Sequence, residues 1–278
     1  MSVSVEAGVP DVRPTIAKRG RSYRHLVPLV VGLGLLAVVL AVWQVASTSG
    51  WISPVFLPPP TAVANAFVRL IQKGYVDSTL WQHAGASLGR VFTALLFAVL
   101  IAVPAGLLIA TSPIGRGVLD PVIEFLRPLP PLAYLPLVII WFGIGEPSKI
   151  LVIALAMIAP IAISTASGVR SASVSQVNAA RSFGATRLQV LLHVLVPSAL
   201  PSILTGIRIA LGAGWSTLVA AELVAAARGL GYMIQSAAQF LVTDVVIVGI
   251  LVISALAFVF EALLRLIERR FVPWSRNQ

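Results

Sequence analysis

The sequence predicts an all-α polytopic membrane protein with six transmembrane helices and both termini in the cytoplasm. Of its residues 58% are hydrophobic and only 11% are charged, whereas a soluble domain carries about 25% charged residues. Six apolar runs are each long enough to cross the hydrocarbon core, which takes about 20 residues. The net charge of +10 comes mostly from Lys and Arg that flank these runs, as topology signals do. The lipid bilayer is therefore the expected partner, and nucleic acid is not.

The N-terminal residues 1–25 are polar and basic, and we expect them to form a cytoplasmic tail. Residues 26–47 are apolar and predict the first span. A basic segment followed by an apolar run is also typical of a signal peptide. The span is favoured because the run is long and Val45-Ala46-Ser47 is a poor cleavage site.

A mixed segment follows the first span. Leu57-Pro58-Pro59-Pro60 is a turn sequence, and the apolar residues of Thr61–Lys73 fall at helical spacing, which predicts an interfacial helix. The chain then divides into the tail (1–25), the first span with its extracytoplasmic segment (26–82), a transmembrane core (83–270) and a cytoplasmic C-terminal tail (271–278). The other five spans are predicted at 88–110, 118–142, 150–169, 198–227 and 244–264.

Basic residues set the orientation of these spans. With the N-terminus inside, the outer segments carry only four of them, Arg69, Lys73, Lys149 and Arg228. The inner segments carry thirteen: Arg13, Lys18, Arg19, Arg21, Arg24, Arg116, Arg170, Arg181, Arg187, Arg265, Arg269, Arg270 and Arg276. This asymmetry predicts that residues 170–197 lie in the cytoplasm.

Residues 178–201 form a polar interruption between apolar runs in the second half of the chain. Apolar residues recur at helical spacing on both sides of Gly184, which suits a left-handed helix C-cap and a close backbone approach. Pro197 fits the first turn of a new helix. The pattern predicts two short amphipathic helices outside the membrane, just before a span. A connecting loop without a partner is the alternative.

This stretch resembles the coupling motif of type-1 ABC importer permeases. Ala179, Ala180, Gly184 and Pro197 match at the family spacing, whereas Asn178 replaces the family's glutamate. The resemblance implies coupling helices at 171–195 that dock into a cytoplasmic ATPase, without a salt bridge at Asn178. The residues expected to contribute are Asn178, Ala179, Ala180, Arg181, Gly184, Ala185, Arg187 and Pro197.

The resemblance covers nearly the whole chain after residue 50 and is strongest to the taurine members of the nitrate, sulfonate and taurine branch. It implies a type-1 transmembrane domain in the bacterial cytoplasmic (inner) membrane, paired with a second copy of itself and with an ATPase homodimer that binds ATP and Mg. An extracytoplasmic solute-binding protein delivers the substrate, and Lys149 and Arg228 help to attract it. Permeases for aliphatic sulfonates, nitrate or bicarbonate remain alternatives. The runs that carry the likeness are 79–83, 127–137, 141–146, 214–223 and 228–233.

The fifth run contains two ionisable residues, Arg208 and Glu222. Fourteen residues of helix separate them by about 21 Å, so they cannot pair with each other and each needs another partner or a wet path. We expect Trp215, Ser216, Thr217 and Glu222 to line a translocation pathway. The alternative places Arg208 and Glu222 near the two membrane interfaces.

The third run combines charges with prolines that break helices. Glu124 and Arg127 are three residues apart and can pair on one helix face. Non-helical backbone at membrane depth is tolerated only where protein or water covers it. The run is therefore either a kinked helix or one that unwinds at a gate, and we assign Arg127 and Tyr134 to the pathway.

No enzyme chemistry is predicted for this chain. It has no Walker A pattern, so ATP hydrolysis falls to a partner subunit. It has no cysteine, and its three histidines lack metal-ligand partners at the usual spacing. An ATP-independent secondary transporter is a second class, although it predicts inverted repeats that the sequence does not display.

Overall fold

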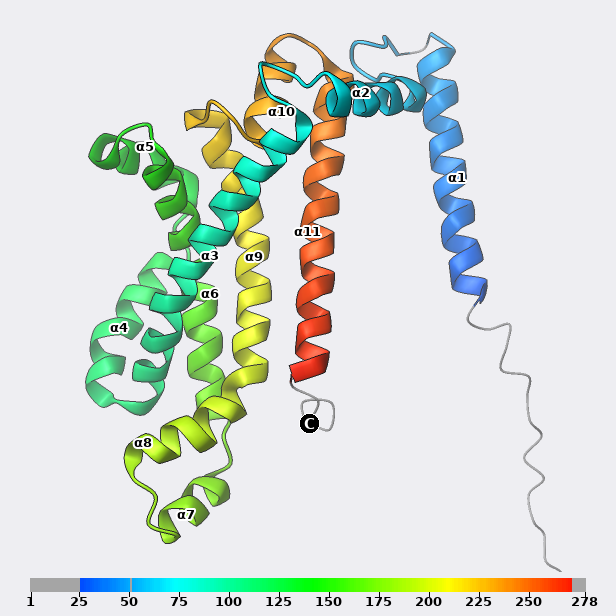
Figure 1. Ribbon diagram of the computed structural model, residues 1–278. Coiled ribbons are helices and arrows are strands. Elements are labelled where there is room, and N and C mark those ends of the chain that lie inside the picture. The colour runs from blue at the N-terminus through cyan, green and yellow to red at the C-terminus, as the bar shows by residue number, and fades with distance from the viewer. Residues whose placement is uncertain (1–25, 51, 272–278) are drawn as a thin grey trace, which may run out of the picture.

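The computed structural model describes residues 26–50 and 52–271, and all of the elements named below are helices (Figure 1). The predicted tail at 1–25 and residues 272–278 lie outside the described residues. The helices are α1 (Leu26–Thr48), α2 (Pro60–Gln72), α3 (Leu80–Thr111), α4 (Pro113–Leu126), α5 (Pro131–Phe142), α6 (Glu146–Arg170), α7 (Val174–Ser182), α8 (Arg187–Val190), a π-helical turn (Leu191–Leu195), α9 (Val196–Ala225), α10 (Leu230–Gln239) and α11 (Thr243–Phe271).

Five of the six predicted spans are continuous helices that are long and apolar enough to cross a membrane. The third is broken into α4 and α5, whose axes differ by 104°. The break follows from the proline-rich sequence after Arg127, because Pro130 has an extended backbone and proline cannot donate a helical hydrogen bond. Of the two forms predicted for this run, the structure adopts the one in which the helix is interrupted.

The core lies where α3, α6 and α9 pack together, and small residues allow their backbones to approach closely. Gly106 of α3 faces the carbonyl oxygen of Ala162 on α6, and Gly206 of α9 faces Ser164 on α6. Pro104 and Pro160 lie inside α3 and α6 without ending either helix. Close contact therefore joins helices whose surfaces are as apolar as the lipid around them.

Replacing Gly206 with alanine is expected to lower stability by about 1–3 kcal/mol, the usual cost of overpacking. A Cβ atom there would lie 2.5 Å from the Cβ of Ser164. Gly212→Ala, in the same helix, is the matched control because a Cβ at Gly212 meets nothing within 4 Å. The melting temperatures of the two purified variants give the comparison, and equal values would contradict this account of the packing.

One end of the molecule is organised by α2, which extends from α1 to α11 (Figure 1). Val63, Ala66 and Leu70 give it a buried face, as the predicted amphipathic pattern requires. Arg69 of α2 forms an ion pair with Asp244 of α11 at 2.9 Å. α7 and α8 lie at the opposite end of the molecule, toward which α1 begins and α11 finishes (Figure 1).

Candidate functional site

The predicted coupling segment begins with α7, which ends in the left-handed C-cap that the sequence suggested. Gly184 has φ +79°. Its N–H donates to the carbonyl oxygen of Arg181 at 2.9 Å, and the N–H of Ala185 donates to that of Ala180 at 3.1 Å. These are the two hydrogen bonds of a Schellman motif, and they reverse the chain toward α8.

The second helix of this segment differs from the prediction, because it is continuous with the following span. A capping box between Thr186 and Gln189 starts α8. The helix then passes through the π-helical turn Leu191–Leu195 and becomes α9. Pro197 lacks an N–H to donate to the preceding turn, and a π-turn is one way for a helix to absorb such a break. α8, the π-helical turn and α9 therefore form one uninterrupted helical segment.

The tip formed by α7 and α8 is exposed and partly apolar. Phe183 is 92% exposed and Leu188 is 62% exposed. Phe183 lines a hollow of about 410 Å³ together with Gly184 and His193. Of the predicted coupling residues, Ala180 and Ala185 are half-buried, and the exposed ones are Asn178, Ala179, Arg181, Gly184, Arg187 and Pro197. This apolar surface has no cover within the described chain.

The predicted pathway residues divide between two regions. Trp215 and Thr217 are buried in the core, where Trp215 stacks on Phe260 at 6.3 Å. Ser216 is exposed on another side of α9. Arg127 is exposed at the end of α4, and Tyr134 is half-buried on α5. The pathway role of these side chains stays a prediction.

Glu222 lies in a buried ion-pair network near the end of the molecule where α10 lies. Its side chain is 0% exposed, and Arg90 of α3, 4% exposed, donates to its Oε1 at 2.5 Å. Arg90 also binds both carboxylate oxygens of Glu146 on α6, at 2.6 and 2.8 Å. Ser87 donates to Glu222 at 2.8 Å. One guanidinium thus joins three spans.

The same network holds the start of α10. The N–H of Gly229 donates to Nδ1 of His83 at 3.2 Å, and that of Leu230 donates to Oγ of Ser87 at 2.9 Å. The N–H of Gly231 donates to Oε2 of Glu222 at 2.8 Å. These groups satisfy the free donors at a helix start. Gly229 has φ +138°, and a Cβ there would overlap the Glu222 carboxylate.

Sequence reasoning identified Glu222 but not Arg90, its partner. Arg90 is an ionisable residue inside the apolar run 88–110, and an ionisable residue inside an apolar run is the signal that identified Arg208 and Glu222. Lys149, expected to help attract the substrate, is instead 4% exposed and donates to Glu146 at 2.9 Å.

Two further expectations from the sequence concern Arg208 and the pair Glu124 and Arg127. Arg208 finds a partner on α11, Glu268, at 3.4 Å. This agrees with the expectation that it cannot reach Glu222. Within the described ranges no ion pair joins Glu124 to Arg127, so their predicted pairing is wrong. Arg127 is the C-cap of α4, where the chain turns into the proline-rich break.

Curated relatives match most of the chain. It is 55% identical over 247 residues to the taurine transport system permease protein TauC of Escherichia coli (strain K12), covering 88% of this chain and 90% of that protein. It is 40% identical to the putative aliphatic sulfonates transport permease protein SsuC of the same strain, covering 85% and 89%. It is 32% identical to the nitrate import permease protein NrtB of Leptolyngbya laminosa, covering 91% and 90%.

Solved structures share the fold at lower identity. An inward-facing MetNI methionine ABC transporter chain superposes with TM-score 0.59 at 20% identity, covering 69% of this chain and 96% of that chain. A chain of an amino acid ABC transporter crystallised with histidines gives TM-score 0.57 at 22% identity, covering 74% and 96%. The family model described as binding-protein-dependent transport system inner membrane component matches residues 102–273. The chain therefore belongs to this family of inner membrane transport components.

Proposed function

We propose that this chain is the permease subunit of an ATP-driven importer that carries taurine, or a related sulfonate, across the bacterial cytoplasmic membrane. The observation that carries the proposal is the 55% identity to a taurine permease over 88% of the chain. Identity falls to 40% for a sulfonate permease and to 32% for a nitrate permease. Aliphatic sulfonates are the second choice of substrate, followed by nitrate or bicarbonate.

The tip between α7 and α8 is the proposed docking surface for the ATPase. Two features support this role. Phe183 at the tip is 92% exposed, and α8 continues without interruption into the span α9. ATP and Mg bind the ATPase pair, since no Walker A pattern occurs in this sequence. Closure of the ATPase pair would move the tip and bias the spans from an inward-open toward an outward-open state.

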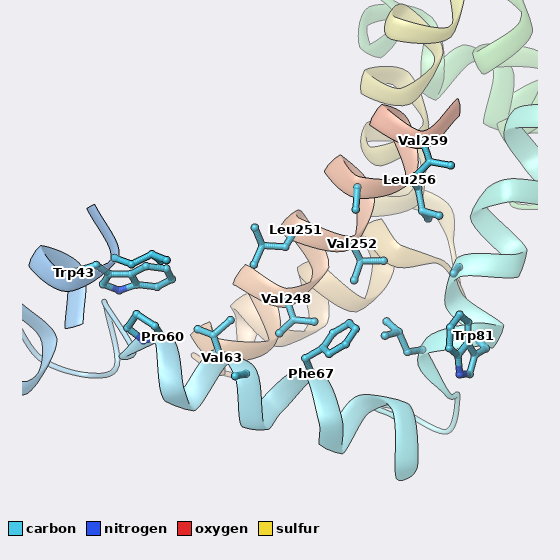
Figure 2. A pocket seen from close by; sticks show the side chains of 15 residues that line it. Trp43, Pro60, Val63, Phe67, Trp81, Val248, Leu251, Val252, Leu256 and Val259 are labelled. Carbon is cyan, nitrogen blue, oxygen red and sulfur yellow. The ribbon is translucent and has the colours of Figure 1, made fainter. Parts of the chain in front are cut away.

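A second copy of the chain is the proposed partner within the membrane. α1, α2 and α11 form an arch around an apolar hollow of about 580 Å³, into which Trp43, Phe67 and Leu251 contribute side chains (Figure 2). The 13 residues of α2 make it about 20 Å long. Helices pack at about 8–10 Å, so one further helix fits between α1 and α11. A helix from the second copy is the occupant that we propose.

The proposed extracytoplasmic partner is a solute-binding protein that delivers the substrate. The loops before α6 and before α10 are the proposed contact surface. Trp141 is 67% exposed and Ile144 is 75% exposed, while Arg228 is also exposed. Because the network around Glu222 fixes the start of α10, the second loop would meet its partner in one conformation.

Taurine uptake into proteoliposomes tests the proposal. The permease, its ATPase and its solute-binding protein should together accumulate radiolabelled taurine, and unlabelled alkanesulfonates and nitrate should compete less well than taurine. An ATPase variant that cannot hydrolyse ATP should abolish uptake. Accumulation by the permease alone would instead favour the ATP-independent class of transporter.

A further inference from the structure

The break between α4 and α5 leaves a carboxylate and a guanidinium without an ion pair between the two ends of the molecule. Glu124 lies in the last turn of α4, and Arg127 is the C-cap residue of that helix. α4 lies nearer the α7–α8 end and α5 nearer the α10 end (Figure 1). Their junction, which includes Arg127, therefore falls between the two ends of the molecule.

These two charges have no cover within the single chain. Both Glu124 and Arg127 are exposed, and neither forms an ion pair in the part of the chain described. The other arginines within the spans contrast with Arg127, since Arg90 and Arg208 each have an acidic partner. Asp120, one turn before Glu124 on α4, is half-buried and also forms no ion pair within the described residues. An ionisable group at membrane depth costs about 2.5–3.5 kcal/mol even on the lower scales, so such groups face water or a ligand.

The spacing of these charges matches one kind of ligand. Residues three apart on a helix are neighbours, with Cβ atoms about 5–6 Å apart. A 2-aminoethanesulfonate has an ammonium group and a sulfonate group separated by two methylene groups, a span within about one helical turn of 5.4 Å. A guanidinium binds a planar or tetrahedral oxyanion through paired N–H donors. A carboxylate accepts hydrogen bonds from an ammonium group.

We propose that Glu124 and Arg127 form a binding site for a zwitterionic aminosulfonate within the permease itself, with Arg127 binding the sulfonate and Glu124 binding the ammonium group. This inference rests on the proposed function. Tyr134, half-buried on α5 beyond the break, packs against the apolar cluster of Leu135, Val138 and Val152, so the two charged side chains carry this site. Selection by charge then takes place at the break as well as in the binding protein.

Direct binding to the permease–ATPase complex in nanodiscs, without binding protein, tests this site. Radiolabelled taurine and its displacement by ethanesulfonate, which lacks the ammonium group, give the two affinities. Glu124→Gln should weaken taurine binding at least tenfold while changing ethanesulfonate binding less than twofold. Arg127→Gln should weaken both ligands at least tenfold, and Glu124→Asp should restore part of the taurine preference.

Arg116→Gln, at the start of the same helix, is the control and should change neither affinity. An equal fall in affinity for taurine and for ethanesulfonate in Glu124→Gln would overturn the inference. The carboxylate would then stabilise the protein structure and would not bind the ammonium group. Unchanged binding in that variant would overturn it as well. Taurine uptake by the complete wild-type transporter is measured separately. Its failure would reject the proposed function, whereas uptake with an unaltered taurine preference in Glu124→Gln rejects only this site.

Discussion

Replacing Gly184 with valine is expected to leave the protein folded and inserted but to lower taurine uptake at least tenfold, while ATP hydrolysis by the assembled complex continues. A residue with a branched Cβ is strongly disfavoured at the φ of +79° that Gly184 adopts. A Cβ there meets nothing within 4 Å, so the effect lies in the turn between α7 and α8 and not in the core. The turn would change shape and the proposed docking tip would be misplaced. ATP hydrolysis and radiolabelled uptake, measured in the same proteoliposomes, check the result.

Gly50→Val is the matched control for this experiment. Gly50 also has a positive φ, +77°, and open space around it, but it follows α1 near the other end of the molecule. It should cost a similar amount of backbone strain without uncoupling uptake from hydrolysis. Gly184→Asn should retain more uptake than Gly184→Val, because asparagine tolerates the left-handed region better. Normal uptake by Gly184→Val would remove the turn from the coupling mechanism.

Replacing Arg90 with methionine is expected to destabilise the protein by about 3–5 kcal/mol, the usual cost of removing one partner from a buried ion pair. The change leaves the Glu222 carboxylate, 0% exposed, without its cation. It also frees Glu146 from its two hydrogen bonds to Arg90. We expect a large fall in the melting temperature of the purified protein.

The double variant Arg90→Met/Glu222→Gln should recover part of this loss, because a neutral amide can still accept the N–H of Gly231. Arg208→Met is the comparison at a more exposed pair, with side chains 34% and 25% exposed and a separation of 3.4 Å. Pairs of that kind contribute about 0–1 kcal/mol. If Arg90→Met and Arg208→Met lowered the melting temperature equally, the network around Glu222 would not be the strong link between the spans that its geometry implies.

Local features of the chain were predicted well because local physics decides them. The bilayer sets the minimum length of an apolar run that can cross it, and all five continuous spans, of 19 to 38 residues, come close to or exceed about 20 residues. Gly184 was predicted to end a helix because glycine tolerates the left-handed region, and its φ of +79° agrees. The break after Arg127 follows from proline chemistry in the same way.

The partner of each charge was not predictable from the sequence. Arg90 and Glu222 are 132 residues apart, and they meet only because α3 and α9 pack side by side. Short sequence separation also predicted an ion pair that does not form, since Glu124 and Arg127 are three residues apart on a helix but do not pair. The π-helical turn that joins α8 to α9 was missed because a local pattern does not reveal whether two helices are continuous.

The sequence alone determined which apolar runs are long enough to cross a bilayer, where the third of them breaks and which segment reverses at a glycine. These features depend on hydrophobic length, on the missing N–H of proline and on the missing Cβ of glycine, each a property of neighbouring residues. Only the tertiary structure decided which charges are neutralised inside the protein and which are left open. That outcome depends on distances between helices that are far apart in the chain, and an ion pair forms or fails over a few ångströms.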